Sequence, residues 1–435
     1  MRLKLIAPQY AEGREKLKDV FPHMALAYLA GLTPPEWEIV IHNEGQGSVD
    51  FDQPADVVGI SCYTYLAPRA YLIANEYRRR GIPVVMGGIH PSTMTEEALP
   101  HADAVVVGEA ELVWREVLDD AKKGTLKRIY RAPHLCDLTH LPTPRFDLFN
   151  LSEYLNAFTM FTTRGCPFNC SYCSISLLYG KTYRKRPIEE VIREARFIKE
   201  AYMSKSSFPG LFFFIDDNIW IDIEYAKELF RRLIPLTISW ISQGSISFCD
   251  DRELLELAAK SGCQSIECGF ETLHPGNLVE VNKGGVDLSR YAEMVKNLHR
   301  VGISVQGTFM VGMTHDEVSS LENIFEFVTD NKIEYPNIFI STPFPGTEYY
   351  KRLDNENRIL SKDWSKYDFR HLVFKPHKMT PKGFKQAYLE LNRKIFSKEC
   401  IEQRVGNCNH FWMEHVNRGK HKLFYDNDWS EWLNE

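Results

Sequence analysis

Short apolar segments alternate with amphipathic helical patterns along most of the 435-residue chain. In residues 1–125 these helical patterns separate the expected strands Leu3–Ala7, Trp37–His42, Asp56–Ser61, Pro83–Gly87 and Asp103–Val107. Strands that are apolar throughout and separated by helices are typical of a parallel sheet buried on both faces. The sequence therefore predicts an α/β domain with a five-stranded, doubly wound sheet of the flavodoxin or Rossmann type, which binds ligands at the carboxyl ends of its strands.

The alternation resumes after residues 126–157, a proline-containing stretch with little periodicity that we interpret as a connector. The strands expected in residues 158–349 are Phe158–Thr163, Leu211–Ile215, Ser239–Gln243, Gln264–Gly269, Ser304–Met310 and Asn337–Ser341. Because six strand–helix units fall short of the eight of a closed barrel, we expect a partial (β/α)6 barrel. Residues 350–435 are expected to form a mostly helical, aromatic-rich region.

Composition excludes several classes of protein. The formal net charge of −6 leaves no basic field that would attract nucleic acid. The longest apolar run, Met24–Leu32, is much shorter than the roughly 18–20 residues of a membrane-spanning helix. The N-terminal apolar stretch contains Lys4 and does not resemble a signal peptide. Ten cysteines in so long a chain make a poor disulfide scaffold, so we expect a cytoplasmic protein with reduced cysteines.

Three of these cysteines lie within eight residues, as Cys166-x3-Cys170-x2-Cys173, directly after the first strand of the second domain. Thiolates in one short loop can hold a single iron–sulfur cluster, and three ligands leave one iron of a [4Fe–4S] cluster open to a substrate or cofactor. Structural zinc prefers four ligands in paired knuckles, for which Cys408 and His410 are a weak second pair. A disulfide cannot use three cysteines, so the spacing favours the open cluster.

The segment Cys166–Cys173, with the aromatic Tyr172 before its last cysteine, resembles the signature of the radical S-adenosylmethionine (SAM) enzymes. In that family SAM binds the open iron, and the reduced cluster cleaves SAM to a 5′-deoxyadenosyl radical that abstracts hydrogen from the substrate. The partial barrel is that family's fold. The resemblance also implies an external electron donor such as flavodoxin or ferredoxin.

Further segments resemble the radical SAM subfamily that has an N-terminal cobalamin-binding domain. They lie after the second, fourth and sixth barrel strands, at Phe214–Asn218, Cys268–Thr272 and Thr342–Thr347. The resemblance implies that SAM is contacted by Tyr172, Asp216, Asp217, Asn218, Gly269 and Glu271. Asp216, Asp217 and Asn218 have an alternative interpretation, as a cluster that caps the helix expected near Asp222.

Three loops of the first domain follow strands and carry glycine with polar residues. From the residues alone they are ordinary turns of a doubly wound domain. The resemblance implies that they contact cobalamin through Ser61, Gly87, Gly88, His90, Gly108 and Glu109. No histidine has aspartate two residues before it, so the sequence names no histidine ligand for cobalt. The pair Gly45 and Gly47 lacks the rest of a dinucleotide fingerprint, which argues against NAD.

The first hypothesis is therefore a cobalamin-dependent radical SAM methyltransferase that acts at a carbon of a small-molecule, lipid or peptide substrate through the 5′-deoxyadenosyl radical and methylcobalamin. The alternative is radical chemistry without methyl transfer, such as cyclisation, rearrangement or oxidation. A non-enzymatic sensor or electron carrier would usually need a fourth thiolate. The methylthiotransferases are excluded because residues 1–150 contain only Cys62 and Cys136, too few for a second cluster.

The aromatic tail, with Trp412, Trp429 and Trp432, also has two interpretations. It is either a lid that dips into a membrane or covers an apolar substrate, or a segment that packs against the open side of the barrel. Buried aromatic packing is the commoner role, so the second interpretation is favoured.

Overall fold

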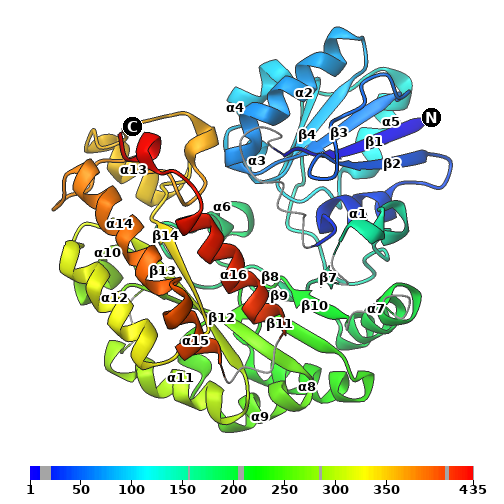
Figure 1. Ribbon diagram of the computed structural model, residues 1–435. Helices are drawn as coiled ribbons and strands as arrows, with labels where there is room; N and C mark the ends of the chain where they lie inside the picture. The colour runs from blue at the N-terminus through cyan, green and yellow to red at the C-terminus, as the bar shows by residue number, and fades with distance from the viewer. Residues whose placement is uncertain (10–20, 155–156, 204–209, 284–286, 407–410, 435) are drawn as a thin grey trace.

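Two parallel sheets with six strands each form the framework of the computed structural model, which describes residues 1–9, 21–154, 157–203, 210–283, 287–406 and 411–434 (Figure 1). The first sheet has the strand order β2-β1-β3-β4-β5-β6 and the second has the order β14-β13-β12-β11-β10-β7. Both parallel sheets, and the helical C-terminal region that follows them, confirm the fold class predicted from the sequence.

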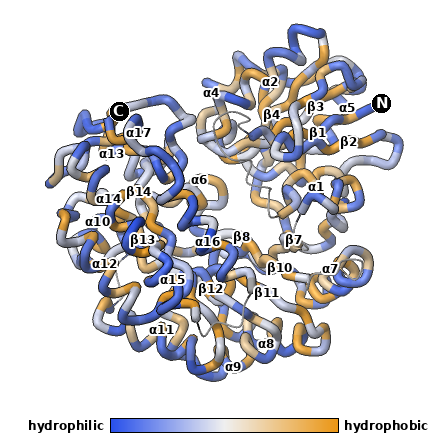
Figure 2. Tube along the Cα trace, viewed as in Figure 1, coloured by the Kyte–Doolittle hydropathy of each residue, from blue (hydrophilic) through white to orange (hydrophobic). Residues whose placement is uncertain are grey.

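The first sheet is made of β1 (Arg2–Ala7), β2 (Glu38–Asn43), β3 (Val57–Ser61), β4 (Val84–Gly87), β5 (Ala104–Val107) and β6 (Ile129–Arg131). Its helices are α1 (Met24–Leu32), α2 (Ala67–Arg79), α3 (Ile89–Thr93), α4 (Thr95–Ala98) and α5 (Trp114–Lys123). Figure 2 shows how strongly hydrophobic residues concentrate on its central strands. The sixth strand, β6, was not predicted. Only Tyr130 of its three residues is buried, so β6 gives no apolar run.

The second sheet is made of β7 (Ala157–Met160), β10 (Leu211–Phe214), β11 (Ser239–Gly244), β12 (Cys263–Glu271), β13 (Ser304–Val311) and β14 (Tyr335–Ile340). The helices between them are α6 (Ile175–Tyr179), α7 (Ile188–Ala201), α8 (Ile223–Leu233), α9 (Arg252–Lys260), α10 (Pro275–Glu280), α11 (Tyr291–Arg300) and α12 (Val318–Asp330). A short antiparallel pair, β8 (Thr163–Arg164) and β9 (Arg184–Lys185), follows β7. The strands β7 and β14 remain the two edges of this sheet, which confirms the partial barrel.

The C-terminal region contains α13 (Glu348–Asn355), α14 (Pro381–Ile395), α15 (Lys398–Val405), α16 (Phe411–Tyr425) and α17 (Ser430–Asn434). It packs along the β14 edge of the barrel, where α16 crosses the sheet (Figure 1). The Trp412 indole donates to the Gln264 side chain at 3.1 Å, and Trp432 is buried. The packing interpretation of the aromatic tail therefore agrees with the structure. Among helices of the described residues, none is long and apolar enough to cross a bilayer.

Buried polar contacts join the first domain to the rest of the chain. The Tyr28 hydroxyl donates to Glu194 at 2.8 Å, and Arg186 holds the same carboxylate at 2.8 Å. Farther along the interface, the Trp364 indole of the C-terminal region donates to both oxygens of Glu97, at 2.8 and 3.0 Å. A hydrogen bond to a charged acceptor contributes more to stability than a neutral one, so Trp364 and Glu97 help to fix the domain orientation.

Replacing Trp364 by phenylalanine removes this hydrogen bond and keeps an aromatic ring. We expect Trp364→Phe to lower the free energy of unfolding by about 1.5–3 kcal/mol, because the Glu97 carboxylate loses the donor that contacts both of its oxygens and keeps only the Tyr71 hydroxyl and the more distant His90. The Trp429 indole N–H is buried without a hydrogen-bond partner among the described residues, so Trp429→Phe is the matched control with a smaller loss. Urea unfolding followed by circular dichroism makes the comparison, and equal losses would contradict the assigned role.

Candidate cofactor site

The cluster loop, residues 161–174, runs from the end of β7 to the start of α6. Its thiols, on Cys166, Cys170 and Cys173, are half-buried, whereas every other described cysteine is buried. Burial raises the pKa of the Cys173 thiol to about 12. Such thiols stay protonated at neutral pH unless a bound metal centre displaces the proton. Three accessible thiols that need a metal to ionise fit the three ligands of a [4Fe–4S] cluster.

The carboxylate of Asp216, at the end of β10, holds the start of this loop. Asp216 is fully buried and accepts hydrogen bonds from the backbone N–H and hydroxyl groups of Thr162 and Thr163, at 2.6–3.1 Å. The neighbouring Asp217 accepts from the Gly165 N–H at 2.7 Å. Gly165 has a φ of +90°, and a Cβ there would lie 2.2 Å from the Thr182 carbonyl oxygen, so only glycine fits. The end of β10 therefore positions the cysteines.

The motif Asp216–Asn218 does not cap the following helix. Asp222 is the residue that caps α8, and it accepts from the Tyr225 N–H at 3.0 Å. The buried Asn218 accepts from the Ser245 N–H at 3.2 Å. Asp217 stays half-buried, and burial raises its pKa to about 6. Asp216 and Asn218 thus brace loops, while their predicted contacts with SAM, like that of Asp217, stay predictions.

The end of β12 brings Tyr172, Gly269 and Glu271 together beside Cys170. Burial and the nearby charge of Glu271 raise the pKa of the Tyr172 hydroxyl, and the same charge acts on the Cys170 thiol. Glu271 has a φ of +62° at an irregularity of β12, a conformation that is uncommon outside glycine. A Cβ on Gly269 would lie 2.4 Å from the Glu271 carboxylate, so glycine leaves room for that side chain.

Sequence reasoning missed Lys283, which completes this group. Its ammonium donates to Glu271 and to the Gly269 carbonyl, both at 2.7 Å, and its charge lowers the pKa of Cys166 and Cys170 against the effect of burial. A neighbouring cation favours the thiolate form that binds iron. Lys283 follows Glu271 by 12 residues, and only the turn through α10 returns it to the site, so no local motif marks it.

The six residues predicted to contact cobalamin lie at or after the carboxyl ends of β3, β4 and β5. Gly108 has a φ of +81°, and a Cβ there would meet no atom within 4 Å. A Cβ on Gly88 would instead lie 2.8 Å from the Cys62 carbonyl oxygen, because the loops after β3 and β4 pack together. His90 lies in α3, fully buried, with its Nε2 3.0 Å from the Tyr71 hydroxyl. Its side chain therefore faces the protein.

Glu109 of the first domain forms ion pairs with two arginines of the second domain. Its carboxylate accepts from Arg164 and Arg184, both at 2.8 Å, and from the Cys136 N–H at 2.9 Å. Glu111 pairs with Arg164 at 2.6 Å. The Glu109 and Glu111 carboxylates and the Cys136 sulfur approach within 4.8 Å, as metal ligands do, but the two guanidinium groups already neutralise the carboxylates. Because Arg164 and Arg184 flank the cysteines, this network joins the first domain to the cluster loop.

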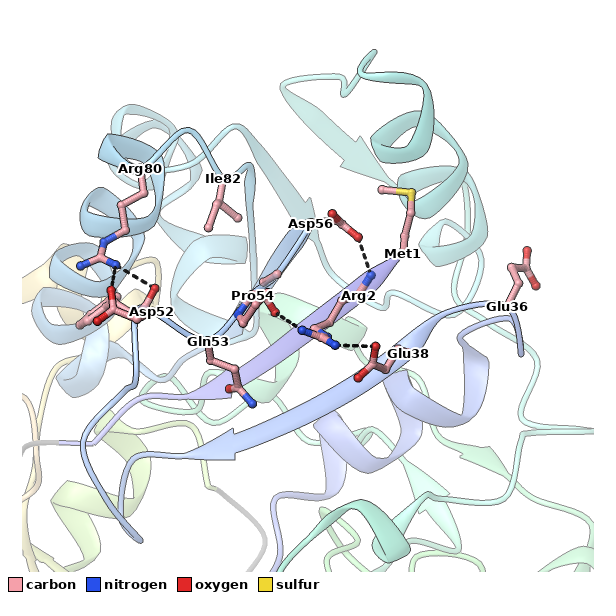
Figure 3. Close-up of a pocket in the computed structure, with 12 residues that line it drawn as sticks. Met1, Arg2, Glu36, Glu38, Asp52, Gln53, Pro54, Asp56, Arg80 and Ile82 are labelled. Carbon is pink, nitrogen blue, oxygen red and sulfur yellow. Dashed lines mark hydrogen bonds and ion pairs between the residues drawn. The ribbon is translucent and has the colours of Figure 1, made fainter.

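A surface cavity of about 650 Å³ lies elsewhere, at the amino-terminal ends of β1 and β2 (Figure 3). Its Arg2 guanidinium is bound by Glu38 at 2.8 Å and by the Pro54 carbonyl at 3.3 Å. Ligands of doubly wound sheets bind at the opposite, carboxyl edge. This cavity is therefore not the cofactor site.

Comparisons with known proteins agree with this arrangement. The family model for the B12 binding domain matches residues 16–118, and that for the radical SAM superfamily matches residues 160–328. Bacteriochlorophyllide d C-12(1)-methyltransferase of Chlorobaculum tepidum is 34% identical over 366 residues, which cover 83% of this chain and 79% of that protein. The chain belongs to the B12-binding radical SAM methyltransferases. The C-8(2)-methyltransferase of the same organism is 32% identical, over 88% of each chain.

A solved structure has the same fold as this chain over nearly its whole length. TsrM of Kitasatospora setae, a radical SAM methyltransferase with cobalamin and a [4Fe–4S] cluster bound, superposes with a TM-score of 0.71 over 98% of each chain at 15% identity. The cofactors of this methyltransferase are a [4Fe–4S] cluster, SAM and cobalamin, as the sequence predicted. Its membership of an enzyme family also favours the enzyme hypotheses over the electron carrier.

Replacing Asp216 by asparagine tests how the cluster loop is held. An amide nitrogen in place of one carboxylate oxygen would face N–H and O–H donors, so we expect Asp216→Asn to lose most of its bound iron. Asp222→Asn is the matched control, because asparagine caps helices as well as aspartate does. Iron and sulfide per chain, measured after anaerobic reconstitution, make the comparison. Full iron content in Asp216→Asn would show that the loop does not depend on this carboxylate.

Proposed function

We propose that this methyltransferase adds a methyl group to a carbon of a chlorin-type tetrapyrrole. The observation that carries the proposal is the likeness, at 34% and 32% identity over more than four fifths of this chain, to two enzymes named for methylating bacteriochlorophyllide d.

In this proposal Cys166, Cys170 and Cys173 hold the cluster through their half-buried thiols. When bound, the cluster supplies the electron that cleaves SAM, and cobalamin carries a methyl group. Glu271 and Asp217 offer carboxylates beside the cluster loop for the amino and ribose groups of SAM. Lys283 holds the Glu271 carboxylate and so orients it toward the cysteines.

The cobalamin ring would lie between the carboxyl edge of the first sheet and the cluster loop. Ser61 and Gly108 are half-buried at that edge, and the backbone at Gly88 turns beside them. Glu109 acts by position, because its bonds to Arg164 and Arg184 fix the edge relative to the cysteines.

Three phenylalanines at the carboxyl end of β14 suit a flat, apolar substrate. The Phe369 ring lies 5.0 Å from Phe339 and 5.1 Å from Phe344, measured between ring centroids, and Phe369 is 36% exposed. Partly exposed aromatic rings in one cluster bind large planar ligands by stacking and by burial of apolar area. The cluster therefore supports a macrocyclic substrate.

The reaction also needs an electron donor from outside the chain, such as flavodoxin or ferredoxin. Reduced thiols and a low-potential cluster are kept in a reducing compartment, which supports a cytoplasmic location.

Loss of one cluster ligand tests the chemistry. We expect Cys170→Ala to lose the cluster and all cleavage of SAM to 5′-deoxyadenosine, because two thiolates cannot hold the cluster. Cys400→Ala is the control, since Cys400 lies buried in α15. Iron content and 5′-deoxyadenosine, measured by chromatography with a strong reductant present, make the comparison. Undiminished SAM cleavage in Cys170→Ala would contradict the assigned ligand set.

The same assay with methyl-deuterated SAM and bacteriochlorophyllide d tests the product. Mass spectrometry should find one trideuteromethyl group on a carbon of the macrocycle. A modified macrocycle without the label would favour ring closure or oxidation. An unmodified macrocycle would contradict the substrate class.

A further inference from the structure

A belt of polar side chains crosses the second sheet on the face turned away from its helices. The register places Gln243, Glu267, Gln306 and Tyr335 side by side on β11, β12, β13 and β14. In-register residues of parallel strands point to the same side. The alternate residue Phe270 packs instead on Tyr291 of α11, with ring centroids 5.0 Å apart. The inner face of this partial barrel is therefore polar at mid-height, whereas closed barrels are filled there by branched apolar residues.

The polar belt includes one acidic group, Glu267. Its side chain is half-buried and accepts a hydrogen bond from the Thr308 hydroxyl at 2.8 Å. Burial raises the pKa of this carboxyl, and the Thr308 hydrogen bond and the charge of Lys420 oppose that rise. Glu267 thus has a hydrogen-bond partner within the sheet, Thr308, and lies in the electric field of Lys420, which comes from outside the sheet.

Two cations of the C-terminal region lie beside β14. α16 is held against β14 by Asn417, whose side chain donates to the Glu334 carbonyl at 3.0 Å. The Lys420 ammonium on the same helix lies 5.9 Å from the centre of the Tyr335 ring. Arg370 follows Phe369, whose carbonyl accepts the Ile340 N–H at 2.9 Å, so the segment carrying Arg370 runs along the edge of β14.

Neither cation is neutralised within the described part of the chain. Lys420 and Arg370 are half-buried, and among the described residues no carboxylate forms an ion pair with either side chain. Burial and the charge of Arg370 together lower the pKa of Lys420 to about 7, and the charge of Glu267 opposes them. Cations withdrawn from water are normally paired at close range, and here Glu267 acts on Lys420 only from beyond ion-pair distance. The two cations therefore leave room for a further anion.

We propose that Arg370 and Lys420 bind a carboxylate of the substrate at the inner face of the partial barrel. Arginine offers a planar pair of donors that matches a carboxylate, and lysine adds a compact charge. This inference rests on the proposed function and narrows it, because the substrate must be an acid.

The position of the polar belt also determines how far the carboxylate of the substrate must lie from the end that reaches the cluster. Glu267, in the belt, precedes Glu271, beside the cluster, by four residues of β12. At about 3.3 Å per residue of extended strand, the belt lies at most about 13 Å from Glu271, since the irregularity of β12 shortens this stretch. The substrate therefore carries its carboxylate on the far side of a body about as wide as a macrocycle, and Phe339, Phe344 and Phe369 lie along the intervening stretch of β14 and its neighbours.

Binding of two matched chlorins tests the inference. Pheophorbide a has a free carboxyl group, and its methyl ester lacks that charge. We expect the wild-type protein, loaded with its cofactors, to bind the acid about tenfold more tightly than the ester, as charge-assisted hydrogen bonds imply. Lys420→Met and Arg370→Gln should each reduce this preference, and the double variant should abolish it. Arg418→Met is the matched control, because Arg418 lies on α16 but is exposed and paired with Glu414. Dissociation constants from absorbance titrations make the comparison.

Equal affinity of the wild-type protein for acid and ester would overturn the inference, as would an unchanged preference in the double variant. Sodium propionate separates this failure from failure of the substrate class. Propionate should raise the midpoint of thermal unfolding of the wild type and of Arg418→Met. It should raise that of the double variant by less. An effect of propionate without chlorin binding would support the carboxylate site and contradict the macrocycle. An equal effect of propionate on all variants would contradict the site.

Discussion

The carboxylate of Glu109 fixes the two domains to one another at the place where their cofactors must meet. Its side chain is only 3% exposed, and it is bound by Arg164 and Arg184. Withdrawing a carboxylate from water is costly unless well-placed charges compensate it, and removal of one partner of such a pair costs about 3–5 kcal/mol. The pair therefore holds only one relative position of the domains well. Methyl transfer between two cofactors depends on that position, because a reacting group misplaced by even about 1 Å slows a reaction strongly.

The cluster loop depends on a second set of buried acceptors that belong to the sheet. Asp216 and Asp217 take up backbone donors of the loop that would otherwise lack partners. Of the residues predicted to contact SAM, some support the loop, such as Asp216, and others keep a polar atom beside the cysteines, such as Glu271. The backbone of Glu271 has a positive φ, which agrees with a role in the site because strained backbone persists where a site requires it.

The C-terminal region completes the inner face of the barrel as well as covering an edge. An edge strand exposes unpaired backbone groups, and β14 is covered by α16 and by the segment around Phe369. The same covering brings Arg370 and Lys420 to the polar belt. In our proposal one region therefore both protects the edge strand and supplies the two cations that recognise the substrate.

The sequence by itself determined the fold class, the order of the domains and the cofactors. The alternation of apolar strands and helices is a local pattern, and the three cysteines of this chain that can hold one cluster lie in one short loop, so both features are written in consecutive residues. The strand β6 escaped prediction because a single buried residue leaves no periodic pattern. The tertiary structure alone decided the pairing of Glu109 with Arg164 and Arg184, the place of Lys283 beside Glu271, and the meeting of Lys420 with the sheet. These partners come from distant segments, and side chains of opposite charge or complementary shape leave no mark in the sequence until the topology of the sheets brings them into contact.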